Sequence, residues 1–125
     1  AKMSCFANST NNANEDWLIS PAINLSTLTT NAKMTFQTAS RFAGNVLEIY
    51  VSTNYTGGAP STATWTQITN ATLDLNTSAY IWTNSGDIDI SSYIGNPNFR
   101  VAFKYTSTTS ASRTWEVDNV KVTGQ

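Results

Sequence analysis

One stretch of the chain decides the fold class: Phe99-Arg100-Val101-Ala102-Phe103-Lys104-Tyr105. Large apolar residues occupy every second position, and Arg100, Ala102 and Lys104 lie between them. Because successive side chains of a β-strand point to opposite faces, this alternation predicts a strand with one face in a core and the other in water. Half-buried strands of this kind are typical of antiparallel sheets.

The same period of two appears earlier in the chain. In residues 33–38, Met34 and Phe36 share one face, and in residues 45–52 the alternate residues 47, 49 and 51 are apolar while Glu48 faces water. Turn sequences rich in Gly, Asn and Pro separate these runs and a shorter one at residues 16–20. We therefore expect an all-β sandwich or barrel, with one helical turn at residues 91–94.

Length and composition set further limits. The chain of 125 residues fits one domain, residues 1–125, which can bury a core without disulfides. Its net charge is −1 and its seven basic residues are scattered, which argues against nucleic acid as a partner. No apolar run approaches the length of a membrane span. The lone cysteine, Cys5, is interpreted as a small apolar residue rather than a reactive thiol.

The last predicted strand contains a change of phase. Trp115 and Val117 share one parity, whereas Val120 and Val122 share the other. A regular strand cannot place all four in the core. A β-bulge at residues 118–119 would correct the phase, and it would lie at an acidic residue, Asp118.

Five segments in this order resemble the choice-of-anchor J and cleaved-adhesin families. They are NEDWLISPAI (14–23), YVSTNY (50–55) followed by TWT (64–66), SGDIDISSY (85–93), FRVAFKY (99–105) and TWEVDNV (114–120). The resemblance implies a jelly-roll β-sandwich of two antiparallel sheets, similar to galactose-binding-like and MAM domains. It also implies a module of a larger surface or secreted protein, especially of Bacteroidetes-type bacteria, and the adhesin relatives imply structural calcium.

A metal site of this protein would have to use oxygen ligands, because the sequence has no histidine and one cysteine. Terminal strands can lie side by side in a jelly roll, so we expect calcium to be held by Glu15, Asp16 and Asp118. The alternative is that these carboxylates accept hydrogen bonds from turns and backbone amides. Asp87 and Asp89 form a second acidic pair, for which the favoured role is Asp89 capping the helical turn.

Aromatic residues suggest a sugar-binding surface. Sugars are usually bound by an exposed flat ring together with amides or carboxylates for their hydroxyl groups. Trp82, close to Asn84, is the preferred platform, with Trp65 as a second candidate, although both could be structural. Trp17 and Trp115 alternate with polar residues and are predicted to lie in the core.

Catalysis is not expected from this sequence. Nucleophilic triads need a histidine base, and no phosphate-cradling loop is present. The predicted function is a non-catalytic adhesion or binding module, located extracellularly or at the cell surface, whose partner is a glycan or an extracellular protein. The alternatives are a structural spacer of a larger surface protein, and an accessory domain of a secreted carbohydrate-active enzyme or protease.

Overall fold

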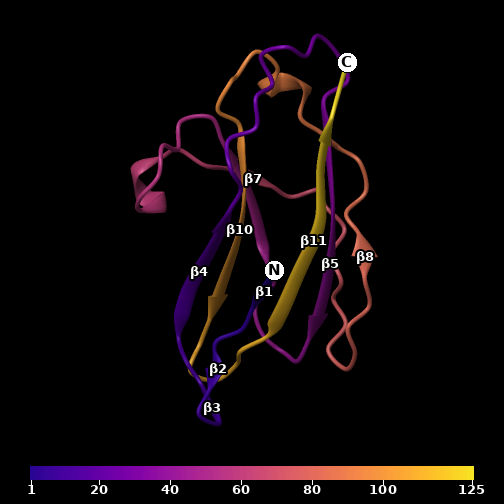
Figure 1. Ribbon diagram of the computed structural model, residues 1–125. Coiled ribbons are helices and arrows are strands. Elements are labelled where there is room, and N and C mark those ends of the chain that lie inside the picture. The colour runs from indigo at the N-terminus through magenta and orange to yellow at the C-terminus, as the bar shows by residue number, and fades with distance from the viewer.

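Two antiparallel sheets pack face to face in the computed structural model, which describes residues 1–125 (Figure 1). The β11 sheet has the strand order β1-β11-β5-β8, with β9 also paired to β5, and the β10 sheet has the order β4-β10-β6-β7. The β11 sheet contains β1 (Lys2–Met3), β5 (Lys33–Arg41), β8 (Thr83–Asn84), β9 (Ile88–Asp89) and β11 (Thr114–Thr123). The β10 sheet contains β4 (Asn14–Ile19), β6 (Glu48–Ser52), β7 (Thr66–Ile68) and β10 (Arg100–Ser107). The predicted all-β sandwich of two antiparallel sheets is confirmed.

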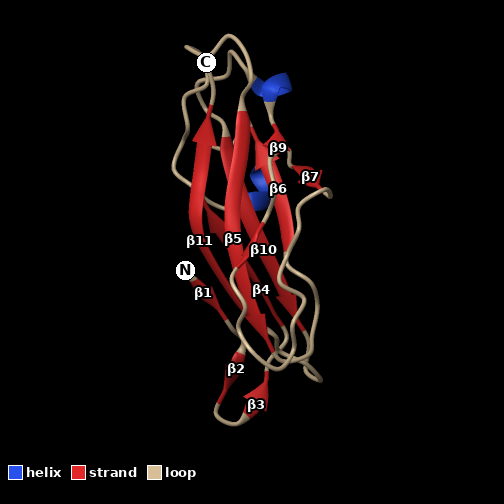
Figure 2. Cartoon of the chain, turned by 90° about the vertical axis from the view of Figure 1, so that its right-hand side faces the viewer, coloured by secondary structure: helices blue, strands red, loops and turns tan.

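The remaining elements are short. A hairpin of β2 (Phe6–Ala7) and β3 (Thr10–Asn11) projects from one end of the sandwich, as Figures 1 and 2 both show. Two 3-10 turns, η1 (Pro60–Thr62) and η2 (Ser91–Tyr93), lie in connections. The η2 turn occupies the predicted helical position. Its N-cap is Ile90 rather than Asp89, and Asp89 instead accepts a 2.8 Å hydrogen bond from the amide of Ser91 in an Asx-turn that leads into η2. No helix of the structure has the length and apolarity required to cross a bilayer.

The core forms where the period-two faces of the two sheets meet. Phe36 of β5 and Phe103 of β10 are fully enclosed and meet edge to face, with ring centroids 5.0 Å apart. Ile49 and Val51 of β6 lie opposite Phe103 and Val101, and all are buried. The alternation read from the sequence is thus confirmed for the central strands, and burial of these faces is the main source of stability.

The predicted bulge is present in β11. Asp118 pairs with Gln37 and Lys121 with Thr35, so two residues of β11 oppose one of β5. Asn119 takes a left-handed backbone conformation, with φ at 52°, which asparagine tolerates better than most residues. The phase change brings Val122 back against the core, whereas Val120 lies at the bulge and is 40% exposed. The expectation that all four apolar residues are buried is therefore wrong for Val120.

The two tryptophans predicted to be core residues have different environments. Trp115 is fully buried, and its indole N–H donates to the carbonyl of Asn45 at 3.2 Å. For Trp17 the prediction is wrong, because its neighbour Leu18 takes the inward position opposite Phe103. Trp17 then faces outward opposite Lys104, on the outer face of the β10 sheet.

Candidate functional site

The structure does not bring the three predicted calcium ligands together. Asp118 lies on β11, whose neighbours are β1 and β5, whereas Glu15 and Asp16 lie on β4, whose neighbour is β10 of the other sheet. The first strand, β1, does lie beside the last one, but it precedes the acidic pair. The expectation of a shared site was wrong because it identified the family-like strand at residues 14–19 with the terminal strand of the sheet.

Glu15 and Asp16 also point to opposite faces of β4, as adjacent residues of a strand must. Asp16 accepts hydrogen bonds from the thiol of Cys5 at 3.2 Å and the side-chain amide of Asn14 at 2.8 Å. Nowhere in the structure are three or more carboxylate, thiol or imidazole groups placed to hold a metal ion. Asp87 forms an ion pair with Lys33 at 2.7 Å. Calcium binding stays a prediction from the sequence.

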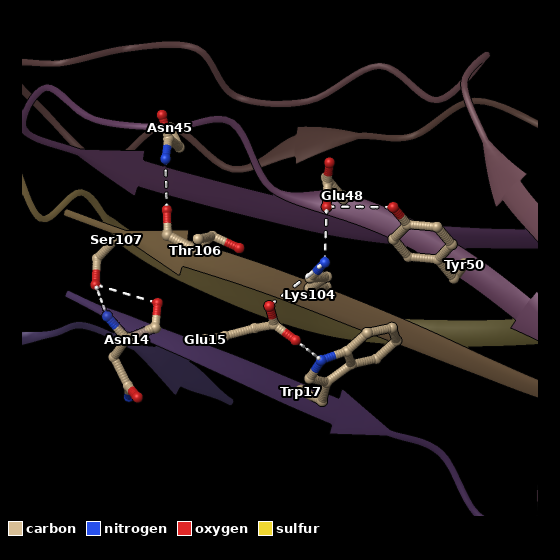
Figure 3. A network of polar contacts seen from close by, with 9 residues as sticks. All are labelled: Asn14, Glu15, Trp17, Asn45, Glu48, Tyr50, Lys104, Thr106 and Ser107. Carbon is tan, nitrogen blue, oxygen red and sulfur yellow. Dashed lines mark hydrogen bonds and ion pairs between the residues drawn. The ribbon is translucent and has the colours of Figure 1, made fainter. Parts of the chain in front are cut away.

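An aromatic and charged network covers the outer face of the β10 sheet (Figure 3). The ring of Trp17 lies 5.6 Å from that of Tyr50 and 5.4 Å from that of Trp65, centroid to centroid. The Lys104 ammonium lies 5.3 Å from the Trp17 centroid, and 3.6 Å and 3.8 Å from the carboxylates of Glu15 and Glu48. Cation–π and ionic contacts hold the lysine between three strands of the sheet.

The polar groups of this network satisfy one another. The indole N–H of Trp17 donates to Glu15 at 2.7 Å, and this hydrogen bond, together with nearby Lys104, holds the pKa of Glu15 below its usual value. Burial, followed by the charge of Glu48, raises the pKa of Tyr50. The indole of Trp65 donates to the carbonyl of Pro60 at 2.9 Å. Few groups are left free to bind a ligand, so we interpret this face as a rigid cross-strand brace.

Trp82, on the outer face of the β11 sheet, differs from this network because its polar group is not satisfied within the protein. It precedes β8, whose Thr83 and Asn84 pair with residues 38 and 37 of β5. Its side chain is 48% exposed, and of the four tryptophans it is the one whose indole N–H has no partner within the protein. It therefore offers both an apolar ring and an unused donor.

Unused polar groups surround Trp82. A shallow hollow of about 270 Å³ is lined by Trp82, Lys2, Glu116 and Asp118, among others. Lys2 and Glu116 are cross-strand neighbours, yet the side chains of both lack intramolecular hydrogen bonds or ion pairs. Asp118 uses one oxygen to accept from the amide of Asn119, which leaves the other free.

Amides continue this row of polar side chains across the sheet. Asp118 pairs with Gln37, and Gln37 with Asn84. Gln37 accepts a 2.6 Å hydrogen bond from the side-chain amide of Asn119, and Asn84 accepts one from the Gly86 amide, so the donor group of each remains unused. The face thus combines one exposed indole with free carboxylates, amides and an ammonium.

Asp74 fixes the segment that carries Trp82. One oxygen of its buried carboxylate accepts from the amides of Ser40 and Ile81, at 2.7 and 3.1 Å, and the other accepts from the amide of Asn76 at 3.0 Å. Burial favours the neutral acid, but the three hydrogen bonds outweigh it and, with the charge of Arg113, keep the pKa of Asp74 below its usual value. The clamp ties the strand of Ser40 to the residue next to Trp82.

Sequence reasoning missed this clamp. The available signal was Asp74 itself, because an aspartate in a turn often accepts a hydrogen bond from the backbone amide two residues on, as in an Asx-turn. It also missed Arg113, which is buried below the same loop and donates to Ser40 Oγ at 2.9 Å. Its guanidinium lies 4.7 Å from the ring centroid of Trp115.

The predicted sugar-binding residues are divided between the two faces of the sandwich. Trp82 and Asn84 lie together on the outer face of the β11 sheet. Trp65 packs on Trp17 and on Tyr55, with centroids 5.5 Å apart in the latter pair, and so belongs to the network on the β10 sheet. The two candidate platforms are therefore separate, because residue 65 precedes an edge strand of the opposite sheet.

Comparison with known proteins places the chain in a family. Residues 22–125 match the model of a family described as "Domain of unknown function (DUF5017)". The match covers most of the chain, which therefore belongs to that family. A search of curated proteins found no match.

Proposed function

We propose that this member of the DUF5017 family is a non-catalytic glycan-binding module whose binding surface surrounds Trp82. The observation that supports this most directly is the unused donor and large exposed area of Trp82, in a protein whose other tryptophans are all hydrogen-bonded internally. An indole ring can stack on the apolar C–H face of a sugar while its N–H reaches a hydroxyl group.

The groups around Trp82 match the hydroxyl groups of a sugar in kind. Hydroxyls both donate and accept hydrogen bonds, so a sugar site needs acceptors and donors close together. Glu116 and the free oxygen of Asp118 are acceptors, while Lys2 and the amide nitrogens of Asn84 and Gln37 are donors. Because none of these groups is engaged within the protein, binding would not first have to break an internal bond.

The scaffold supports the same role. Trp82 directly precedes the paired strand β8 and follows Ile81, whose amide the Asp74 clamp holds, so its backbone is anchored on both sides before a ligand binds. Pre-positioned side chains bind with a smaller loss of conformational entropy. The uncharged polar composition suits an exported protein, and we propose a secreted or cell-surface location in a larger multidomain protein, with adhesion to glycan as its task.

Affinity electrophoresis of the whole chain tests the proposal, with soluble xylan, mannan, pectin and chondroitin sulfate as probes. We expect retardation by at least one polysaccharide, loss of retardation in Trp82→Ala, and an intermediate result in Trp82→Phe, which keeps a ring but lacks the N–H donor. Val46→Ala is the matched control, because Val46 is 49% exposed and precedes β6 of the other sheet.

Two results would count against the proposal. Retardation that survives Trp82→Ala would place binding elsewhere on the protein. Failure of every probe to retard the wild-type chain would favour the alternative role, a spacer domain of a larger surface protein. Thermal melting of each variant shows whether a change in retardation reflects the loss of a side chain or loss of the fold.

A further inference from the structure

A second hollow opens next to the one at Trp82. It has a volume of about 490 Å³ and lies where β1, the β2–β3 hairpin, the turn after β5 and the loop before β11 meet. Its volume falls within the range of ligand pockets, about 300–1,000 Å³. Lys2 lines both hollows, so the two adjoin at this side chain.

Two exposed phenylalanines form the apolar part of this hollow. Phe6 on the hairpin is 58% exposed, and Phe42 after β5 is 50% exposed. Phe42 has a φ of 73°, a left-handed conformation that bulky residues rarely adopt, at a cost of about 1–3 kcal/mol. The Arg41 guanidinium lies 5.0 Å from its ring centroid. The fold thus exposes the aromatic ring of Phe42 to water on a backbone conformation that is unfavourable for phenylalanine.

The rest of the lining is polar. Asn11 pairs with Phe6 across the hairpin, and its side-chain amide has no partner within the protein. Ser4 and Ser110 contribute hydroxyl groups, and the ammonium of Lys2 is free. A lipid chain would require walls that are apolar throughout. Separated aromatic rings with amide and hydroxyl groups between them instead match the alternation of apolar and hydroxylated surface along a sugar chain.

Alternate residues of β11 line both hollows, although Thr114 is itself buried and donates to Ser4 Oγ at 3.2 Å. Thr114 lines the Phe42 hollow, while Glu116 and Asp118 line the Trp82 hollow. At about 3.3 Å per residue, the step from residue 114 to residue 118 covers about 13 Å along the strand. We propose that the two hollows form one groove along β11, which binds an internal segment of an oligosaccharide chain, with separate sugar positions at Trp82 and at Phe6 and Phe42. This rests on the proposed glycan-binding function and specifies its ligand as an extended chain rather than a single terminal sugar.

Calorimetry with oligosaccharides of increasing length tests the inference. The probes are the disaccharide and the octasaccharide prepared from whichever polysaccharide retards the wild-type chain. We expect the octasaccharide to bind at least about tenfold more tightly than the disaccharide. Phe6→Ala and Phe42→Gly should remove this gain and leave disaccharide affinity unchanged, whereas Trp82→Ala should weaken both ligands.

Phe42→Gly also separates binding from folding. Glycine adopts a left-handed conformation without strain, so this variant should melt at or above the wild-type temperature while it loses affinity for the octasaccharide. Val46→Ala again serves as the control that changes neither ligand.

The failures of the two proposals are distinguishable. Equal affinity for both oligosaccharides, or a length gain that survives both phenylalanine substitutions, overturns the groove and leaves the site at Trp82 standing. Disaccharide affinity that survives Trp82→Ala overturns the proposed function itself. A wild-type chain that binds a polypeptide and no glycan overturns both.

Discussion

Replacing Asp74 by asparagine should destabilise the protein in a pH-dependent way. The substitution puts an NH₂ group where a carboxylate oxygen now accepts from the amides of Ser40 and Ile81. A hydrogen bond to a charged group contributes about 1.5–3 kcal/mol. The Ile81 amide can turn to water on its exposed loop, whereas the Ser40 amide is buried. We therefore expect a loss of about 3 kcal/mol and a melting temperature lower by about 10 °C.

The pH dependence follows from the lowered pKa of Asp74. Its usual value is 3.8, and a folded-state pKa below that means that folding favours the ionised form. The stabilisation is complete above the unfolded-state value and is lost as the pH falls through the folded-state pKa. The difference in melting temperature between wild type and Asp74→Asn should therefore be largest near neutrality and should narrow below about pH 3.8.

Circular dichroism melting curves from pH 7 to pH 3 measure both effects. Asp87→Asn is the matched control, because Asp87 is an exposed carboxylate whose ion pair with Lys33 contributes at most about 1 kcal/mol. Equal melting temperatures of wild type and Asp74→Asn would refute the clamp. A difference that stays constant through acid pH would refute the ionic origin of its strength.

Three further outcomes can be measured by thermal melting. Asn119→Ala should lower stability by about 1–2 kcal/mol, because alanine is disfavoured at a φ of 52°, and an unchanged melting temperature would contradict the left-handed bulge. Lys104→Met should lower the free energy of unfolding by less than about 2 kcal/mol, since the cation–π and ion-pair contacts of Lys104 are partly exposed. An unfolded variant would show that the brace on the β10 sheet contributes more stability than this. If calcium binds as the sequence predicts, a hundredfold excess over the dissociation constant adds about 2.7 kcal/mol, so EGTA should lower the melting temperature by about 10 °C, and no shift would contradict the prediction.

The strands with strict alternation could be predicted from the sequence because local order alone determines which side chains are buried. The alternation around Phe36 and Phe103 predicts that both face the core, and the change of phase at Asp118 predicts the bulge. Pairing between distant strands leaves no such local mark. That is why the sequence could place Asp118 at an irregular strand and still assign it the wrong neighbours.

The candidate site shows the same division. The preference for Trp82 over the buried Trp115 came from the weaker alternation around residue 82, and its exposure in the structure is consistent with that choice. The same reasoning wrongly predicted that Trp17 is buried, because alternation indicates that one face of a strand is buried but not which one. The free indole of Trp82, the Asp74 clamp and the hollow at Phe42 depend on contacts between segments far apart in the chain, which no local pattern encodes.

The bulge in β11 also makes this strand one residue longer than its partner requires. Removal of Asn119 would leave Lys121 opposite Thr35 and move Val120 inward opposite Phe36, which would add up to about 1.5 kcal/mol of apolar burial. The chain thus leaves Val120 partly exposed in favour of an insertion that lets the side-chain amide of Asn119 donate to Gln37. Deletion of Asn119 would therefore give a more stable sandwich whose β11 sheet has a flatter outer face.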